Sequence, residues 1–516
     1  MQVECILKYK TLHMNKIGFK NFRRFVDFKP IEYKDITFLV GRNNSGKSTM
    51  VKALLLINEF LKNGNISKFS FSNSNIEDVN IVTYDRAKNK KSKKEDFITF
   101  EFRQDDFNVE ITISGQEDKT AVDVIYFNIF DFSRNVVFKI EPQNTQITIE
   151  NLIAKTNDNV TNENNSLLTE LQTTQKLLKA QLNEILDKSS QEYIIINQQL
   201  KVLLSKIKDL KAIIKKETIT QANFSVSVHY SEDAISDILS NSIVEINSQY
   251  EKDYIEIQKG KKQTKRFNDL RAFKENKFSI EKSAECFLYQ IKNNRIAYLG
   301  ATLTKQSALF AIRDKSNALA QAIHEFNQLN IAPGEVAYRF VQKWMSEDEF
   351  EVGKSLSFKM HAGEAYEVLV NTNGATIPLA DKGMGSIQAM LLIFRLATLI
   401  HKKIKDKKEY TIIIEEPELN LHPKLQSKLA DLFHYVHKEF KIKFIVETHS
   451  EYLIRNTQLL VKENEYEVKP NENPFCVLYF DNEEQWNMNY REDGKFTTEF
   501  GKGFYDESSL LTLSLL

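Results

Sequence analysis

A glycine-containing octapeptide, Gly41-Arg-Asn-Asn-Ser-Gly-Lys-Ser48, lies between an apolar run that is typical of a buried strand, Asp35–Val40, and a segment with helical periodicity, Met50–Leu61. It fits the pattern G-x-x-x-x-G-K-[ST], in which backbone N–H groups turn inward around a phosphate. The 516 residues include only 16 glycines, so a chance match to this spacing is rare. The sequence therefore predicts a strand–loop–helix unit that binds phosphate.

Each residue type in this loop suits a nucleotide phosphate. Lys47 is expected to reach the β- and γ-phosphates, and the Ser48 hydroxyl to ligate Mg²⁺. We expect the whole loop to contact the nucleotide, namely Gly41, Arg42, Asn43, Asn44, Ser45, Gly46, Lys47, Ser48 and Thr49. The alternative is a glycine loop that carries no ligand.

A second apolar run, Thr411–Ile414, ends in two carboxylates, and Pro417 then forces the chain out of the strand. At such a strand end one carboxylate can hold the metal and the next can orient or deprotonate the attacking water. We assign Glu415 to Mg²⁺ and Glu416 to the water. An acidic helix cap is the alternative interpretation.

His449 follows the next strand-like run, Lys443–Val446. Ligands of α/β proteins bind at the carboxyl ends of the sheet strands, so a histidine there can contact the γ-phosphate or the attacking water. The alternative is a structural histidine. His434 and His437 share one face of a predicted helix, Lys424–Phe440, but the absence of a third ligand argues against zinc.

A second glycine turn, Asp381-Lys-Gly-Met-Gly-Ser386, stands directly before a predicted helix, Gln388–Lys402. Helix N-termini attract anions because their N–H groups are unpaired. One loop already serves the protomer's own nucleotide, so Gly383, Gly385 and Ser386 are expected to contact the phosphate held by a partner subunit. The alternative is a tight turn between the preceding hairpin, residues 364–379, and the helix.

The order of predicted elements indicates an α/β fold. Strand-like alternation fills residues 95–150, and the last third alternates helix and strand, which predicts a parallel sheet with crossover helices. Between Leu168 and Ile214, apolar residues recur at spacings of three and four around a break at Asp187–Ser190. This pattern predicts a short antiparallel coiled-coil hairpin, or alternatively two amphipathic helices on a globular core. We expect four units: residues 1–150, 151–220, 221–360 and 361–516.

Composition excludes several classes of protein. Lys and Arg total 70, as do Asp and Glu, so the chain is not globally basic. Three scattered cysteines indicate a reducing compartment, and the N-terminus does not resemble a signal peptide. The apolar stretch Ala389–Ile400 is too short to cross a bilayer. We therefore expect a cytoplasmic protein.

Local basic clusters at Lys88–Lys94, Lys259–Lys277 and Lys201–Lys216 could still bind nucleic acid without sequence specificity.

Taken in order, the motifs "FKNFRRFVDF", "ITFLVGRNNSGKST", "LADKGMGSIQ", "IIIEEPELNLHP" and "VETHSEYL" resemble ABC/SMC-class ATPases of the RecF- and OLD-like branch. The resemblance covers residues 14–60 and about 360–460. It implies an ABC-type ATPase head that binds ATP and Mg²⁺. Lys47, Glu416 and His449 would be catalytic, and Gly383, Gly385 and Ser386 would act in trans across a homodimer or a larger assembly. Residues 420–423 would lie near the D-loop, and Gln104 is a guess for the Q-loop.

OLD-like nucleases carry a fused TOPRIM domain, but only 66 residues follow Ser450. Asp481, Glu483 and Glu484 could mimic its metal ligands, although a solvated turn is the better interpretation. The chain resembles stand-alone ATPases of bacterial anti-phage systems such as Septu, which act with a separate effector such as an HNH nuclease. A RecF-like DNA repair ATPase and an ATP-binding scaffold are the alternatives.

Overall fold

The computed structural model describes residues 15–155 and 219–505, apart from residues 73–78, 80, 94–95, 302–305, 373, 465, 467–471, 482–483, 492 and 502–503. It also describes isolated positions between 156 and 218 and at 514. The predicted coiled-coil hairpin, its lysines and the N-terminal 14 residues therefore lie outside the described residues.

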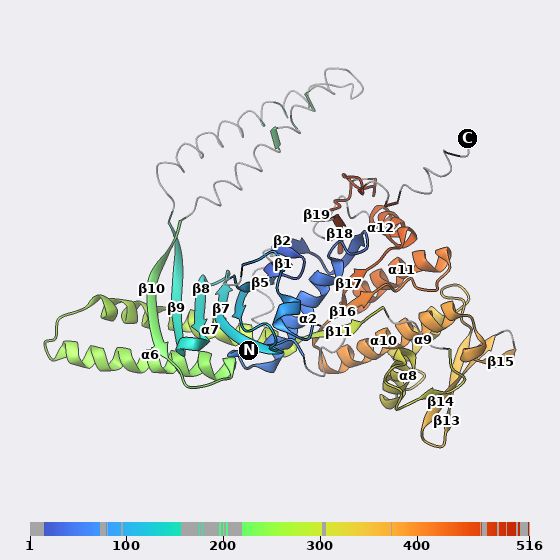
Figure 1. Ribbon diagram of the computed structural model, residues 1–516, viewed down its shortest axis with the longest axis horizontal. Helices are drawn as coiled ribbons and strands as arrows, with labels where there is room; N and C mark the ends of the chain where they lie inside the picture. Colours follow the sequence, from blue (N-terminus) through green and yellow to red (C-terminus); the bar gives the residue numbers. More distant parts are fainter. Residues whose placement is uncertain are drawn as a thin grey trace.

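An antiparallel sheet of nine described strands forms the N-terminal part (Figure 1). Its order is β10-β9-β8-β7-β6-β5-β1-β2, and β4 pairs with β7. The alternating residues predicted as strands after residue 95 do form strands, with buried and half-buried positions alternating in β5. The strands are β1 (Asn15–Phe22), β2 (Phe25–Tyr33), β4 (Lys68–Ser70), β5 (Ile98–Gln104), β6 (Phe107–Ser114), β7 (Ala121–Asp131), β8 (Val136–Glu141), β9 (Gln146–Lys155) and β10 (Ile219–His229).

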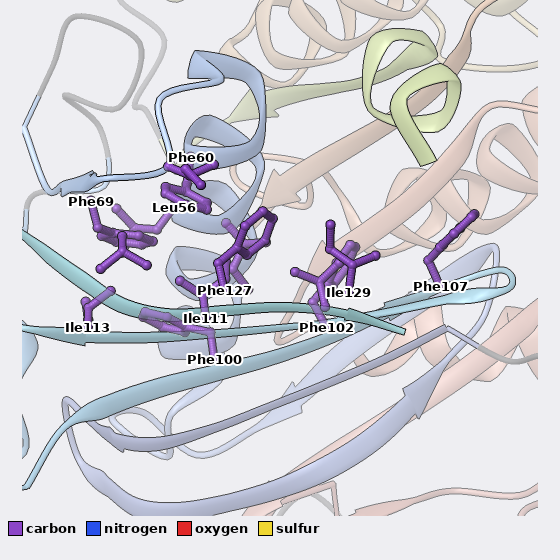
Figure 2. Packing of buried hydrophobic residues seen from close by; sticks show 14 of the residues in the cluster. Leu56, Phe60, Phe69, Phe100, Phe102, Phe107, Ile111, Ile113, Phe127 and Ile129 are labelled. Atoms are coloured by element: carbon purple, nitrogen blue, oxygen red, sulfur yellow. The ribbon is translucent and has the colours of Figure 1, made fainter. Parts of the chain in front are cut away.

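Helix α2 (Lys47–Asn63) follows the glycine loop and packs on one face of this sheet. Figure 2 shows Leu56 and Phe60 of α2 lying over Phe100 and Phe127 of the sheet. Phe60 meets Phe127 edge-on, with ring centroids 5.5 Å apart. Such aromatic packing holds α2 against the sheet.

A second sheet of six described strands has the order β11-β16-β17-β3-β18-β19. The first five strands run parallel, as the sequence predicted, and β19 closes the edge antiparallel to β18. The strands are β3 (Ile36–Gly41), β11 (Asn294–Leu299), β16 (Glu409–Glu415), β17 (Lys443–Glu447), β18 (Phe475–Asp481) and β19 (Glu484–Asn487). Helices α11 (Pro423–Phe440) and α12 (Glu451–Glu463) supply the crossover connections.

Helix α10 (Met384–Asp406) is longer than the sequence predicted. By length and composition alone it could cross a membrane, but 78 % of its most apolar stretch is buried inside the protein. It packs against α8 (Ala318–Gln328) and α9 (Val336–Met345). Its apolar character therefore reflects a place in the core.

The remaining described strands form a small third sheet. It contains β12 (Phe310–Ala311), β13 (Ser355–His361), β14 (Ala365–Thr372) and β15 (Ala375–Pro378). The predicted hairpin over residues 364–379 is confirmed, since β14 and β15 pair antiparallel. A short 3₁₀ turn, Leu379–Asp381, then leads into α10.

The two hydrophobic cores divide the chain differently from the four predicted units. One core joins residues 17–149 to β10, α6 (Ile235–Gln258) and α7 (Lys265–Asn293). The other joins Leu299 and later elements to one face of β3. The predicted boundary at 220/221 falls inside β10, because that strand pairs with β9 although more than 60 residues separate them. Pairing between such distant segments is not visible in local sequence patterns.

His434 and His437 bond within the fold. His434 is 7 % exposed, and its Nε2 lies 2.8 Å from the Tyr466 hydroxyl. Nδ1 of His437 lies 3.2 Å from the carbonyl oxygen of Ile442. Burial, aided by nearby Lys438 and His437, lowers the pKa of His434 to about 4.

This low pKa predicts that the protein loses stability in mild acid. As the pH falls, His434 of the unfolded chain binds a proton near pH 6.5, whereas His434 of the folded chain does so only near pH 4. The free energy of unfolding is therefore unaffected by this group above pH 6.5 and decreases as the pH falls from 6.5 to about 4. Buried carboxylates with raised pKa values shift stability in the opposite direction, so this loss, up to about 3 kcal/mol, is measured as the difference between wild type and His434→Phe in denaturant titrations at pH 7, 5 and 4. His434→Phe should be less stable at pH 7 and show a shallower pH dependence. An unchanged pH dependence would contradict the assignment.

Candidate functional site

The parallel sheet brings three motifs to one edge. Strand β17 lies between β16 and β3, and Glu415 at the end of β16 is in register with Glu447 at the end of β17. Glu447 is in turn in register with Leu39, two residues before the loop glycine Gly41. Carboxyl ends of parallel strands form the ligand-binding edge of an open α/β sheet.

Both loop glycines are required by close packing. A Cβ on Gly41 would lie 2.1 Å from the carbonyl oxygen of Phe480, and one on Gly46 would lie 2.4 Å from the Phe25 ring. Both residues have positive φ, at 140° and 111°. The turn between β1 and β2 therefore packs directly on the phosphate loop. Only a glycine at position 46 permits this contact.

Lys47 is turned into the loop that precedes it. Its side chain is 3 % exposed, and Nζ donates hydrogen bonds of 2.9 Å to the carbonyl oxygens of Gly41 and Arg42. Nζ also lies 3.8 Å from Oε1 of Glu447. Burial lowers the pKa of Lys47, and the carboxylates of Glu447, Glu416 and Glu418 oppose that shift.

Ser48 contacts a carboxylate that the sequence analysis did not select. Its hydroxyl lies 2.9 and 3.1 Å from the two carboxylate oxygens of Glu447. Glu415, the predicted metal ligand, is one strand further from the loop. The sequence shows Glu447 only as the last residue of a strand. Strand order, which single-sequence reasoning does not supply, would have identified it.

Glu447 is an unusual carboxylate. Burial raises its pKa to about 7; Lys47 opposes the shift, while Glu415 and Glu416 add to it. Its side chain is 9 % exposed, so little water reaches the charge. The sheet edge thus concentrates negative charge directly beside the phosphate loop.

Glu416 and His449 lie on the same edge. Glu416 has a φ of 47°, a conformation that costs a residue with a side chain about 1–3 kcal/mol, and its N–H donates a 2.8 Å hydrogen bond to the carbonyl of Glu447. Nε2 of His449 lies 4.0 Å from Oε1 of Glu416. Burial lowers the pKa of His449, and nearby Lys47 adds to this effect. Strain concentrated here is typical of a functional turn.

Glu418 stabilises the loops that carry Glu416 and His449. It is 8 % exposed, and Oε1 accepts a 2.6 Å hydrogen bond from the N–H of His449. Burial raises its pKa. The bond ties the loop after β16 to the loop after β17, so Glu418 is a positioning residue that the sequence analysis did not assign.

A cavity of about 430 Å³ opens above the loop. Seven of its lining side chains are cationic and only one is acidic, Glu447. The cations are Arg23, Arg24, Lys47, Lys52, Arg86, Lys88 and Lys90. Burial lowers the pKa of Arg23, and Arg86 adds to the shift. Crowded cations with depressed pKa values favour a polyanionic ligand.

Two backbone segments hold these cations in place. The N–H of Arg23 donates to the carbonyl oxygen of Ala87, and the Asn89 side-chain amide donates to the carbonyl oxygen of Arg23 at 2.7 Å. Phe22 also bridges to Lys88. The basic run at Lys88–Lys94 was predicted to be a candidate nucleic-acid surface, whereas the structure places Lys88 and Lys90 in the wall of the phosphate cavity.

The second glycine turn, Gly383–Ser386, lies outside the cavity at Lys47. Gly383 precedes the first residue of α10 and is open, whereas a Cβ on Gly385 would lie 2.9 Å from the carbonyl oxygen of Asn420. The turn thus packs on the loop that follows Glu416. Among the described residues, none from Gly383 to Ser386 lines the cavity at Lys47.

The other predicted residues are distributed as follows. Arg42, Asn43 and Asn44 are exposed, and Thr49 is buried in the first turn of α2. Ser45 is 3 % exposed, and its hydroxyl has no hydrogen-bond partner among the described residues. Gln104, the guess for the Q-loop, bonds instead to Asn294 at 2.7 Å, and it does not line the cavity.

These residues fit ATP with Mg²⁺. The Ser45 hydroxyl, which has no hydrogen-bond partner among the described residues, and the seven cations suit a triphosphate. A metal at Ser48 would face Glu447, in keeping with the one or two carboxylates with which Mg²⁺ is usually bound beside phosphates. Asp481 and Glu484, the candidate nuclease ligands, terminate β18 and begin β19, and Glu483 is not described.

Removing a cavity cation should weaken ATP binding. Arg86→Ala is expected to raise the Kd for ATP by about tenfold, the usual value of one charge-assisted hydrogen bond to phosphate. Isothermal titration calorimetry would measure it. Arg271→Ala, an exposed arginine on α7, is the matched control and should leave the Kd unchanged. Equal effects of both substitutions would show that the cavity is not the binding site.

Comparison with solved structures returns SMC head domains at low similarity. One, from Pyrococcus furiosus, has an extended coiled coil and is bound to the C-terminal domain of ScpA; it is 10 % identical with a TM-score of 0.33, covering 97 % of this chain and 100 % of that one. Another, from Pyrococcus yayanosii, has a coiled coil and joint; it is 12 % identical with a TM-score of 0.36, covering 93 % and 98 %. Scores this low add nothing to the assignment. No curated protein matches the chain.

The family, in contrast, is shown by the match to a protein-family model. The model of the AAA ATPase domain family matches residues 13–454, a span that contains the phosphate loop, the second glycine turn, the paired carboxylates and His449. This match covers most of the chain. The protein therefore belongs to the AAA ATPase domain family.

Proposed function

We propose that this protein is an ATP-hydrolysing switch in which two copies close head to tail over shared ATP. The observation that carries the proposal is the separation of two phosphate-type turns: the cavity at Lys47 contains no described residue of the Gly383–Ser386 turn. Gly383 is open, as a surface that meets a partner's phosphate should be. A second copy would supply the missing turn to each site.

The cavity residues have distinct tasks in this proposal. Lys47 would leave the carbonyl oxygens of Gly41 and Arg42 and bind the β- and γ-phosphates. Ser48 and a carboxylate at the strand ends would hold Mg²⁺, which when bound neutralises phosphate charge. The cations from the β1–β2 turn and from residues 86–90 would bind the remaining phosphate oxygens.

Glu416 is the proposed general base. It accepts a proton from water as the water oxygen attacks the γ-phosphorus, and the bond to the β-phosphate oxygen breaks to give ADP and phosphate. Glu416 is one-third exposed, which leaves its carboxylate accessible to water, and His449 lies beside it. The bond from the N–H of His449 to Glu418 would keep this pair aligned.

Glu416→Gln should trap the ATP-bound dimer. The amide cannot accept the proton, so turnover should fall by about 10²–10⁴-fold while ATP binding persists. Steady-state phosphate release and light scattering coupled to size exclusion would report the two effects. Lys47→Ala is the control and should remain monomeric with ATP. Wild-type hydrolysis by Glu416→Gln would refute the assignment.

Gly383 and Gly385 of the second glycine turn offer a matched pair of substitutions. A Cβ at Gly383 would meet no described atom within 4 Å, so Gly383→Arg should preserve folding and ATP binding by the monomer but abolish ATP-dependent dimerisation of the Glu416→Gln protein. Gly385→Ala should instead lower the thermal unfolding midpoint, because its Cβ approaches the carbonyl oxygen of Asn420. Dimerisation of Gly383→Arg with ATP would contradict closure through this turn.

We further propose that the switch belongs to bacterial anti-phage defence and controls a separate effector, such as an HNH nuclease. Support comes from the sequence resemblance to stand-alone ATPases of this kind. Of the three candidate nuclease ligands, the two described ones occupy a strand end and the next strand start. Co-expression with the neighbouring reading frame, and nuclease assays with wild-type and Glu416→Gln protein, would test this role.

A RecF-like DNA repair ATPase is the second candidate. The observation in its favour is the exposed basic tip between α6 and α7, which carries Lys259, Lys262 and Lys265. Phosphate neutralisation there would give salt-sensitive binding without base specificity. ATPase rate and oligomeric mass with and without DNA separate the two: stimulation by DNA alone favours repair, and a requirement for an effector favours defence.

A further inference from the structure

Glu447 is an acidic side chain that contacts both Lys47 and Ser48 of the phosphate loop. Its two oxygens lie 2.9 and 3.1 Å from the Ser48 hydroxyl, and Oε1 lies 3.8 Å from Nζ of Lys47. It is the only acidic residue among the described residues that line the cavity. Glu415 and Glu416, the carboxylates selected from sequence, line no part of it.

This placement creates an electrostatic conflict for the nucleotide. A γ-phosphate that reaches Lys47 must come close to a buried carboxylate, and whenever that carboxylate is ionised the two like charges repel strongly because water is scarce. A cation between the carboxylate and the phosphate reverses the sign of the interaction. The Ser48 hydroxyl, the expected metal ligand, is already hydrogen-bonded to that carboxylate.

We propose that Glu447 makes nucleotide binding depend on a divalent cation, and that Glu447, rather than Glu415, is the carboxylate that faces the metal at Ser48. The inference rests on the proposed ATP-binding function and adds a residue to it. Without the metal, Glu447 excludes the triphosphate and keeps Ser48 and Lys47 occupied by contacts within the chain. With the metal, the same carboxylate favours binding.

The fold supports a dedicated position for this residue. Glu447 is the last residue of β17, held between β16 and β3, so its backbone is fixed on both sides. Its carbonyl oxygen accepts the N–H of Glu416 at 2.8 Å. The metal-facing carboxylate and the proposed general base would therefore move together if either strand end shifted.

The test measures binding rather than turnover. The Kd of a fluorescent ATP analogue is measured at about pH 8.5, where Glu447 is ionised, with Mg²⁺ and with EDTA for wild type, Glu447→Gln and Glu415→Gln. Wild type should bind at least about tenfold more tightly with Mg²⁺. Glu447→Gln should bring the two Kd values together, chiefly by tightening the metal-free complex. Glu415→Gln should retain most of the difference.

A second measurement covers the case in which Glu447→Gln does not fold. Glu447→Asp keeps the charge but shortens the side chain by one methylene, and it should weaken Mn²⁺ binding to the ATP complex, counted by electron paramagnetic resonance, by about tenfold. Loss of the metal dependence in Glu415→Gln with its retention in Glu447→Gln, or unchanged Mn²⁺ affinity in Glu447→Asp, would overturn the inference. Failure of wild type to bind ATP in either condition would instead refute the proposed function.

Discussion

The pairing of β17 with β16 on one side and with β3 on the other sets the geometry of the site. It fixes Glu447 in register with Glu415 and two residues short of the glycine loop. A shift of one residue in either ladder would turn Glu447 to the opposite face of the sheet and place Val446 or Thr448 beside Ser48. The loop, the general base and the proposed metal site therefore depend on one set of parallel hydrogen bonds.

This arrangement carries a cost in stability. Glu418 and Glu447 are buried carboxylates with raised pKa values, Lys47 is a buried ammonium, and Glu416 has a left-handed backbone conformation. Each is unfavourable in isolation. The surrounding apolar strands, β3 and β18 among them, are almost wholly buried and hold these groups in place. Such a balance is typical of functional sites, where stability is traded for chemistry.

The sequence predicted those parts of the molecule that depend on local patterns. The strand before Gly41, the helix that includes Met50–Leu61, the hairpin of β14 and β15 and the parallel sheet all follow from short-range periodicity and turn residues. It did not predict Glu447 or Arg86 as site residues. Both reach the cavity through pairing between distant segments, β17 with β3 and residues 87–89 with the β1–β2 turn, and such pairing leaves no local signature.

The charges around the phosphate loop are arranged in two opposing groups. Cations from the β1–β2 turn, from α2 and from residues 86–90 surround the cavity, while carboxylates occupy the strand ends beneath it. In the described structure the groups meet where Glu447 contacts Ser48 and Lys47. A bound triphosphate with its metal would satisfy both groups, but only after these contacts separate. Since Glu447 also bonds through its backbone to Glu416, that separation would couple occupation of the loop to the position of the general base.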